Sequence, residues 1–63
     1  MRNIQYMLIL TLMARGLSDA QIAREAGISL TTVRRHIKAI MNRLGVSSRF
    51  AAGAAAQRKG WIG

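Results

Sequence analysis

The chain has 63 residues, of which 51% are hydrophobic, so it holds one small domain at most. Ten Lys and Arg residues against two acidic residues give a formal net charge of +8, which favours a polyanionic partner such as nucleic acid. The absence of cysteine excludes a disulfide framework and a thiolate metal site, which leaves self-association as the common way to stabilise so small a fold.

Four helices and no strand are predicted. Proline is absent, and each helical stretch lies between a polar residue suited to an N-cap and a glycine suited to a left-handed C-terminal cap. The predicted helices span about 4–15, 19–26, 30–44 and 48–59. The predicted N-caps are Asn3, Ser18, Ser29 and either Ser47 or Ser48, and the glycine stops are Gly16, Gly27, Gly45 and Gly60. The predicted fold class is therefore all-α, as a single domain over residues 1–63.

The first predicted helix is apolar on nearly all sides. Its apolar run, from Tyr6 to Ala14, is too short to cross a bilayer, which takes about 20 residues. No convincing signal-peptide cleavage site follows this run. A helix that is apolar all round is normally buried, but a domain this small cannot cover every side of one. Two interpretations stay open: an exposed apolar patch that binds a partner, or the cover of a loosely packed core.

The second and third predicted helices share a core and a tight turn. In the third helix, apolar side chains recur at steps of three and four, at Val33, Ile37, Ile40, Met41 and Leu44. The opposite face carries Thr31, Arg35, Lys38 and Asn42, with Arg34 and His36 on its flanks. The second helix and its surroundings contribute Leu17, Ile22, Ala23, Ala26 and Ile28 to the core, with Leu17 as a hydrophobic staple. This layout is that of a helix-turn-helix, whose second helix enters the DNA major groove.

The fourth predicted helix is rich in small residues. Its sequence from Phe50 to Arg58, FAAGAAAQR, permits the close approach of another helix but offers little apolar area. Its caps and its lack of proline and serine favour a helix over a low-complexity linker. Phe50 and Trp61 supply most of the bulk in this region, and we expect Trp61 to pack on the domain rather than to stack on a base.

The motifs and their spacing resemble the DNA-binding domain of LuxR-type bacterial regulators, also called FixJ- or GerE-type. The matching segments are G-L-S-x-x-x-I-A at 16–23, G-I-S-x-x-T-V-x-x-H-I-x-x-I at 27–40, L-G-V-S-S-R at 44–49 and G-W-I at 60–62. The resemblance covers nearly the whole chain. It implies a four-helix domain whose third helix reads DNA and whose fourth helix pairs two copies.

The resemblance implies that Arg34, Arg35 and Lys38 contact base edges. Arginine can bond guanine O6 and N7 together, which contributes about 1–3 kcal/mol of discrimination. The competing interpretation of these three residues is a solvated basic face. Phosphate contacts are expected from Ser29, Thr31, Thr32, Gln21, Arg24, His36, Asn42, Arg43 and Arg49. A helix N-terminus adds free N–H groups and partial positive charge for the same purpose.

Several positions depart from the family pattern. Arg49 matches an arginine that usually pairs with a glutamate on the first helix, but Tyr6 stands at that position, so we expect Arg49 to be free for phosphate or solvent. Ala20 stands where a basic residue usually touches phosphate, and Gln21 and Arg24 are its partial replacements. For His36, packing against the domain and contact with phosphate both stay open.

Two further expectations concern surfaces. Tyr6, Met7 and Leu8 stand where family members carry charges, and we expect these three residues to form the partner-binding patch. The expected dimer interface consists of Phe50, Ala51, Ala54, Ala55 and Arg58, and it is weak because its apolar area is small.

The function expected from the sequence is that of a sequence-specific regulator of transcription in the bacterial cytoplasm. Two copies would bind double-stranded DNA at an inverted repeat. The alternative is a small interaction module that binds RNA polymerase or another regulator through its first helix, with DNA binding secondary. A cationic membrane peptide is disfavoured, because such a peptide needs no helix-turn-helix. An enzyme is disfavoured because the single histidine and two scattered acids offer no nucleophile–base pair, and neither a cofactor nor a metal is expected.

Overall fold

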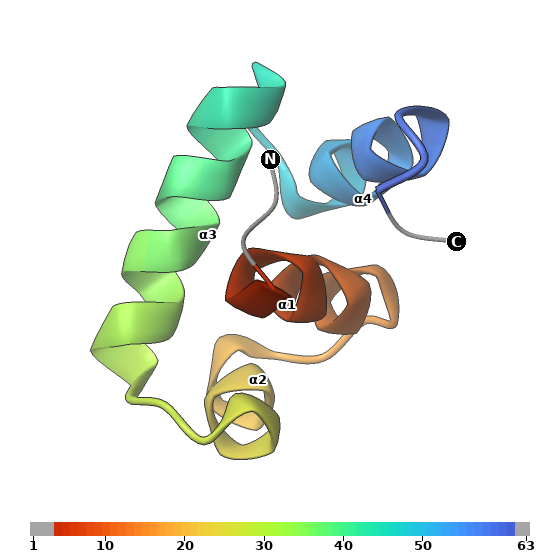
Figure 1. Ribbon diagram of the computed structural model, residues 1–63. Helices are drawn as coiled ribbons and strands as arrows, with labels where there is room; N and C mark the ends of the chain where they lie inside the picture. Colours follow the sequence, from red (N-terminus) through yellow and green to blue (C-terminus); the bar gives the residue numbers. More distant parts are fainter. Residues whose placement is uncertain (1–3, 62–63) are drawn as a thin grey trace.

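The computed structural model describes residues 4–61 and contains four helices in this range, with no strand (Figure 1). The helices are α1 (Ile4–Ala14), α2 (Asp19–Ala26), α3 (Leu30–Leu44) and α4 (Arg49–Arg58). The all-α prediction is confirmed, with α1 one residue shorter and α4 one residue shorter at each end than expected. The predicted N-cap at Asn3 and the Ile62 position of the G-W-I motif lie outside the described residues.

Serine hydroxyls cap three of the helices as the sequence predicted. Ser18, Ser29 and Ser48 each accept a hydrogen bond from a backbone N–H three residues on, at 3.2, 3.1 and 3.1 Å. Ser18 also forms a full capping box, because its own N–H donates to the Gln21 side chain at 2.8 Å. Ser48, rather than Ser47, is the N-cap of α4. Each such cap stabilises its helix by about 1 kcal/mol.

The turn between α2 and α3 depends on Gly27. Its φ of 70° lies in the left-handed region, where a side chain is strained. From this conformation the next residue, Ile28, donates its N–H to the Ala23 carbonyl at 3.1 Å and packs against the core. The turn therefore fixes the direction in which α3 leaves α2. All four predicted glycine stops have positive φ, which confirms their placement.

Helix α1 lies at the centre of the domain, and α2, α3 and α4 surround it (Figure 1). Its residues Ile9 and Leu10 are fully buried, and Leu12 and Met13 are nearly so. Because the other three helices pack on several sides of α1, most of its apolar surface is removed from solvent. The central part of α1 therefore belongs to the core.

The start of α1 is more open and differs from the expected patch. Of the three predicted patch residues, Tyr6 and Met7 are half-buried, and only Leu8 is exposed, at 41%. Tyr6 packs against the core and meets the His36 ring edge-on. Ile4, which the sequence analysis did not single out, is 85% exposed. The exposed apolar surface of α1 thus comes from Ile4 and Leu8, because α3 covers the tyrosine.

The predicted core positions of the helix-turn-helix are confirmed except for Ala26, which is partly exposed and does not belong to the core cluster. Ile22, Val33, Ile37 and Ile40 are buried. The remaining predicted positions that pack against this core while partly exposed are Leu17, Ala23, Ile28, Met41 and Leu44. Trp61 also packs against this core, as expected, and its backbone N–H donates to the Ala56 carbonyl at 2.9 Å.

Small residues of α4 pack inside the domain. Ala52, Gly53, Ala55 and Ala56 are all buried. Gly53 lies against α1, where a Cβ added to the glycine would sit 3.7 Å from the Cβ of Ala14. Ala55, expected at a dimer interface, is only 4% exposed, so that expectation is wrong for this residue. The close helix approach that the small residues permit occurs between α4 and α1 of one chain.

Candidate nucleic-acid interface

The outward face of α3 carries the predicted DNA-reading residues. Arg34, Arg35 and Lys38 are all exposed, as are Thr31 and Asn42 on the same helix. The opposite face of α3 is buried against the core through Val33, Ile37 and Ile40. Figure 1 shows α3 as the longest helix, at the outside of the domain with one side unobstructed by other helices. The buried face therefore fixes a helix whose polar side chains point to solvent.

The N-terminus of α3 is built around Ser29 and Thr32. The Ser29 hydroxyl accepts from the Thr32 backbone N–H and donates to Thr32 Oγ1 at 2.8 Å. The Ser29 hydroxyl is thus occupied by the cap, whereas the Thr32 hydroxyl accepts one bond and keeps its own proton. Together with the free N–H groups of the first turn, this end of α3 can donate to an anion.

Helix α2 presents two of the predicted phosphate-contacting residues. Gln21 and Arg24 are both exposed. The Gln21 side-chain oxygen accepts the Ser18 N–H of the capping box, which holds the side chain at the start of the helix. Its NH₂ group keeps its donors, so Gln21 can still reach an anion.

His36 is half-buried between α3 and α1. Its ring centroid lies 4.9 Å from that of Tyr6, with an interplanar angle of 64°. Edge-to-face packing of this kind favours a packing role, which is one of the two interpretations left open by the sequence. Arg43, by contrast, is exposed near the end of α3.

Arg49 is paired, and the expectation that it is free is wrong. Its Nη1 donates to Oδ1 of Asp19, and its Nη2 donates to the Leu17 carbonyl at 2.9 Å. The start of α4 lies against the connection between α1 and α2, so the first residue of α2 supplies the carboxylate that Tyr6 does not. Arg49 therefore ties α4 to the start of α2.

Asp19 is the residue of this region that sequence reasoning missed. Its second oxygen, Oδ2, lies 3.8 Å from Nε of Arg34, so one carboxylate faces two arginines. The available signal was composition: Asp19 is one of two acids in the chain, and it directly follows the cap Ser18. The sequence alone gave no reason to pair it with arginines far along the chain.

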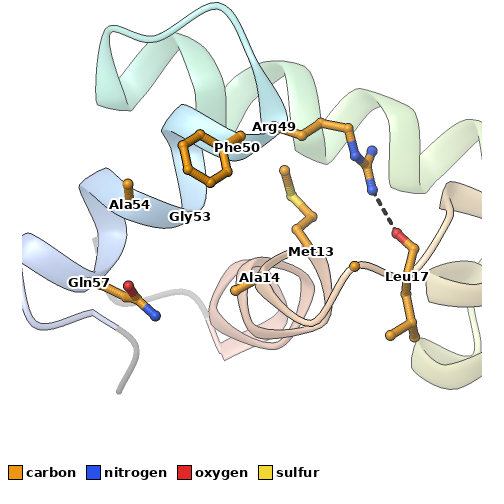
Figure 2. Close-up of a pocket in the computed structure, with 9 residues that line it drawn as sticks. Met13, Ala14, Leu17, Arg49, Phe50, Gly53, Ala54 and Gln57 are labelled. Carbon is orange, nitrogen blue, oxygen red and sulfur yellow. Dashed lines mark hydrogen bonds between the residues drawn. The ribbon is translucent and has the colours of Figure 1, made fainter.

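A groove lies away from α3, between the end of α1 and α4. Its volume is about 430 Å³, and it is lined by Met13, Ala14, Gly16, Leu17, Arg49, Phe50, Gly53, Ala54 and Gln57. Figure 2 shows Phe50 at its rim, and Arg49 turned toward the Leu17 carbonyl. Phe50 is 88% exposed, which is unusual for an aromatic side chain.

The described residues offer no group of three or more side chains suited to a metal ion. Within residues 4–61 no helix has the length and apolar character needed to traverse a bilayer.

Comparison with known proteins agrees with this arrangement. The family model for bacterial regulatory proteins of the luxR family matches residues 5–56. The chain is 53% identical over 49 residues to a bialaphos biosynthetic pathway regulatory protein from Streptomyces hygroscopicus. That match covers 78% of this chain and 19% of the relative, so the chain spans about a fifth of the relative's length. No solved structure matches the chain significantly.

Proposed function

The chain belongs to the luxR family of bacterial regulatory proteins, and on that basis we propose that it regulates transcription by binding double-stranded DNA through α3. The observation that carries the proposal is the division of α3 into two faces. Arg34, Arg35 and Lys38 are exposed on a helix whose opposite face is locked into the core. A rigid helix with exposed cationic side chains is the element that the major groove admits.

Base reading is assigned to Arg34, Arg35 and Lys38. Each arginine has a planar fork of donors that matches the O6 and N7 acceptors of guanine, whereas the lysine is a point charge with less directional preference. Loss of a bidentate contact to guanine costs about 1–3 kcal/mol of discrimination against other bases.

Phosphate contacts are assigned to the N-terminus of α3 and to the side chains around it. The candidates are Ser29, Thr31, Thr32, Gln21, Arg24, His36, Asn42 and Arg43. For Ser29 and His36 the support is weaker, because the first is used in the cap and the second packs on Tyr6. These contacts would position the protein on the duplex without selecting a sequence.

We further propose that two copies bind an inverted repeat as a weak homodimer through α4. The support is the exposed side of α4, where Phe50 stands beside the groove and where Ala51, Ala54 and Arg58 keep access to solvent. Two copies on one face of DNA would place their α3 helices about one helical turn, or roughly 34 Å, apart.

The alternative of an interaction module acting through α1 has less support. Tyr6 and Met7 are half-buried within the domain, so they offer a partner little surface. Ile4 and Leu8 alone do not form a large contiguous apolar patch.

The test is selection of bound DNA from a random duplex pool at physiological salt. Enrichment of an inverted repeat would support the regulator and its dimer together, and enrichment of a single half-site would support a monomeric reader. Binding without any enriched sequence would contradict base reading and leave a generic basic surface.

A further inference from the structure

We propose that Asp19 is a positioning residue for DNA sequence choice: anchored by Arg49, its carboxylate holds Arg34 in an orientation suited to reading guanine. The inference rests on the proposed function, because it assumes that Arg34 contacts bases. It adds a residue that lies on α2, outside the set of side chains expected to touch DNA.

The first step is that Asp19 is itself held in place. Its Oδ1 accepts a hydrogen bond from Nη1 of Arg49, and the same guanidinium is fixed by its second bond, to the Leu17 carbonyl at 2.9 Å. Asp19 is also the first residue of α2, where the helix dipole favours a negative charge. Its side chain is only 30% exposed. The carboxylate is therefore held both by its place at the start of α2 and by Arg49, which is itself bonded to the backbone.

The second step concerns the oxygen that Arg49 leaves available. Oδ2 of Asp19 lies 3.8 Å from Nε of Arg34, which is an ion-pair distance rather than that of a hydrogen bond. A guanidinium has donors at Nε and at both terminal nitrogens. When Nε faces a carboxylate, the two terminal nitrogens remain, and together they match guanine O6 and N7. The Arg34 side chain is 66% exposed, so these nitrogens have access to DNA.

The third step is energetic. A long side chain that is ordered only on binding loses rotamer freedom, and this loss lowers affinity. If Asp19 already restrains Arg34 in the free protein, less rotamer freedom is lost on binding. Affinity then rises for the base whose acceptors match the restrained guanidinium. The expected gain in discrimination at one base pair is about 2- to 10-fold, the range for immobilising one flexible side chain.

The fourth step is electrostatic. Asp19 lines the same surface hollow as Arg34, Lys38 and Asn42, so its negative charge lies beside the reading face. That charge opposes phosphate approach and weakens binding to DNA of any sequence. The contact with Arg34 therefore raises discrimination between bases, whereas the charge of Asp19 lowers the affinity for every duplex alike.

Arg35 and Glu25 supply internal controls. Arg35 is exposed next to Arg34, and the described residues provide no ion pair for it, so the base that it reads should not depend on Asp19. Glu25 is the other acid of α2, and its exposed carboxylate makes no ion pair within residues 4–61. Glu25→Gln therefore makes the same change in net charge as Asp19→Asn without touching Arg34.

The experiment begins with the site that the wild-type protein selects from a random duplex pool. Dissociation constants are then measured for that duplex, for each single base-pair change and for an unrelated duplex. The proteins compared are the wild type, D19N, E25Q, R34A and the double variant D19N/R34A. The position that R34A no longer discriminates is the position that Arg34 reads.

The inference expects D19N to lower discrimination at that position about 2- to 10-fold and to strengthen binding to the unrelated duplex. It expects E25Q to leave every discrimination ratio unchanged. In the R34A background, D19N should have no further effect on discrimination, because Asp19 acts through Arg34. A purely structural role through Arg49 would instead lower affinity at all positions equally, in both backgrounds.

Equal discrimination by D19N and the wild type at the Arg34 position would overturn the inference while leaving the proposed function intact. Failure of the wild type to select any sequence would overturn both. If loss of the Arg49 contact unfolds D19N, D19E decides the matter. It keeps the charge and can still reach Arg49, but it moves the carboxylate by one methylene, so the same selective loss is expected, and its absence would overturn the inference.

Discussion

Arg49 takes a carboxylate partner from α2, although the sequence predicted that its side chain would be free for phosphate or solvent. Asp19 and Arg49 are 30 residues apart in the chain, and only the packing of α4 beside the α1–α2 connection brings them together. The pair joins the first residue of α2 to the first residue of α4 and so links two helices that are not neighbours in the sequence. The second partner of Arg49 is the Leu17 carbonyl, which accepts a hydrogen bond of 2.9 Å. Because this acceptor is a backbone group, the bond does not depend on the side chain at position 17.

Replacement of Arg49 by alanine is expected to lower the free energy of unfolding by about 1–2 kcal/mol. The side chain is 40% exposed, so the ion pair itself contributes modestly, and much of the loss comes from the bond to the Leu17 carbonyl. Urea denaturation followed by far-ultraviolet circular dichroism measures the change. Arg58→Ala is the control: this arginine is exposed and makes no ion pair with another residue of the range 4–61, so the substitution should stay within about 0.5 kcal/mol. Equal effects of the two substitutions would contradict the structural role of Arg49.

At the scale of single elements, local rules predicted more of the fold than of the surfaces. Caps, glycine stops and the spacing of α3 are short-range features, so the helix bounds and the buried face of α3 followed from the sequence. Helices α1 and α4 have no such spacing, because apolar or small residues occupy all their sides. Their buried faces depend on which neighbours surround them. Tyr6 and Ala55 were therefore expected at surfaces and are instead packed within the domain.

The candidate site, too, has one part that the sequence predicted and another that depends on tertiary packing. The exposed cations of α3 followed from its periodicity and from the family resemblance, so Arg34, Arg35 and Lys38 could be named in advance. The pairing of Asp19 with two arginines could not, since it depends on three segments meeting in space. Local chemistry thus predicted the surface that we propose reads DNA, whereas the ion pairs of Asp19 depend on tertiary packing.

Gly53 is predicted to be a place where α4 can be stabilised. It lies inside the helix with ordinary helical backbone, and an added Cβ would meet Ala14 at van der Waals distance, 3.7 Å. Gly53→Ala should raise the free energy of unfolding by about 0.5–1 kcal/mol, because glycine loses more conformational freedom on folding.

Gly27→Ala is the matched comparison, and it should lower the free energy of unfolding instead of raising it. Its φ of 70° costs an L-residue about 1–2 kcal/mol, even though space for a methyl group is available. Thermal unfolding tests both predictions: the midpoint temperature should rise for Gly53→Ala and fall for Gly27→Ala. A destabilised Gly53→Ala protein would mean that α4 and α1 pack too closely for a methyl group.

For the whole molecule, charge is the dominant property. A net charge of +8 on a domain with a radius of gyration of 10.4 Å produces a strong positive field, which pulls phosphate-rich partners in from solution. The same field opposes association of two copies in the absence of DNA. Since α4 offers Phe50 and little other exposed bulk, we expect the dimer to form mainly on DNA, where phosphates neutralise both copies.

The last prediction is therefore a steep dependence of DNA affinity on salt. A dimer that neutralises about 6–10 phosphates should lose roughly 10³- to 10⁵-fold in affinity between about 50 mM and about 200 mM salt. Fluorescence anisotropy with a labelled duplex, repeated across this range, gives the slope of log K against log salt. Arg24→Ala should make the slope shallower by about 1 for each bound copy while leaving the selected sequence unchanged. Arg15→Ala, directly after the end of α1 that Figure 1 shows on the side away from α3, should alter the slope less. A slope that Arg24 and Arg15 affect equally would mean that phosphates are held by the diffuse field of the whole domain and not by the face formed by α2 and α3.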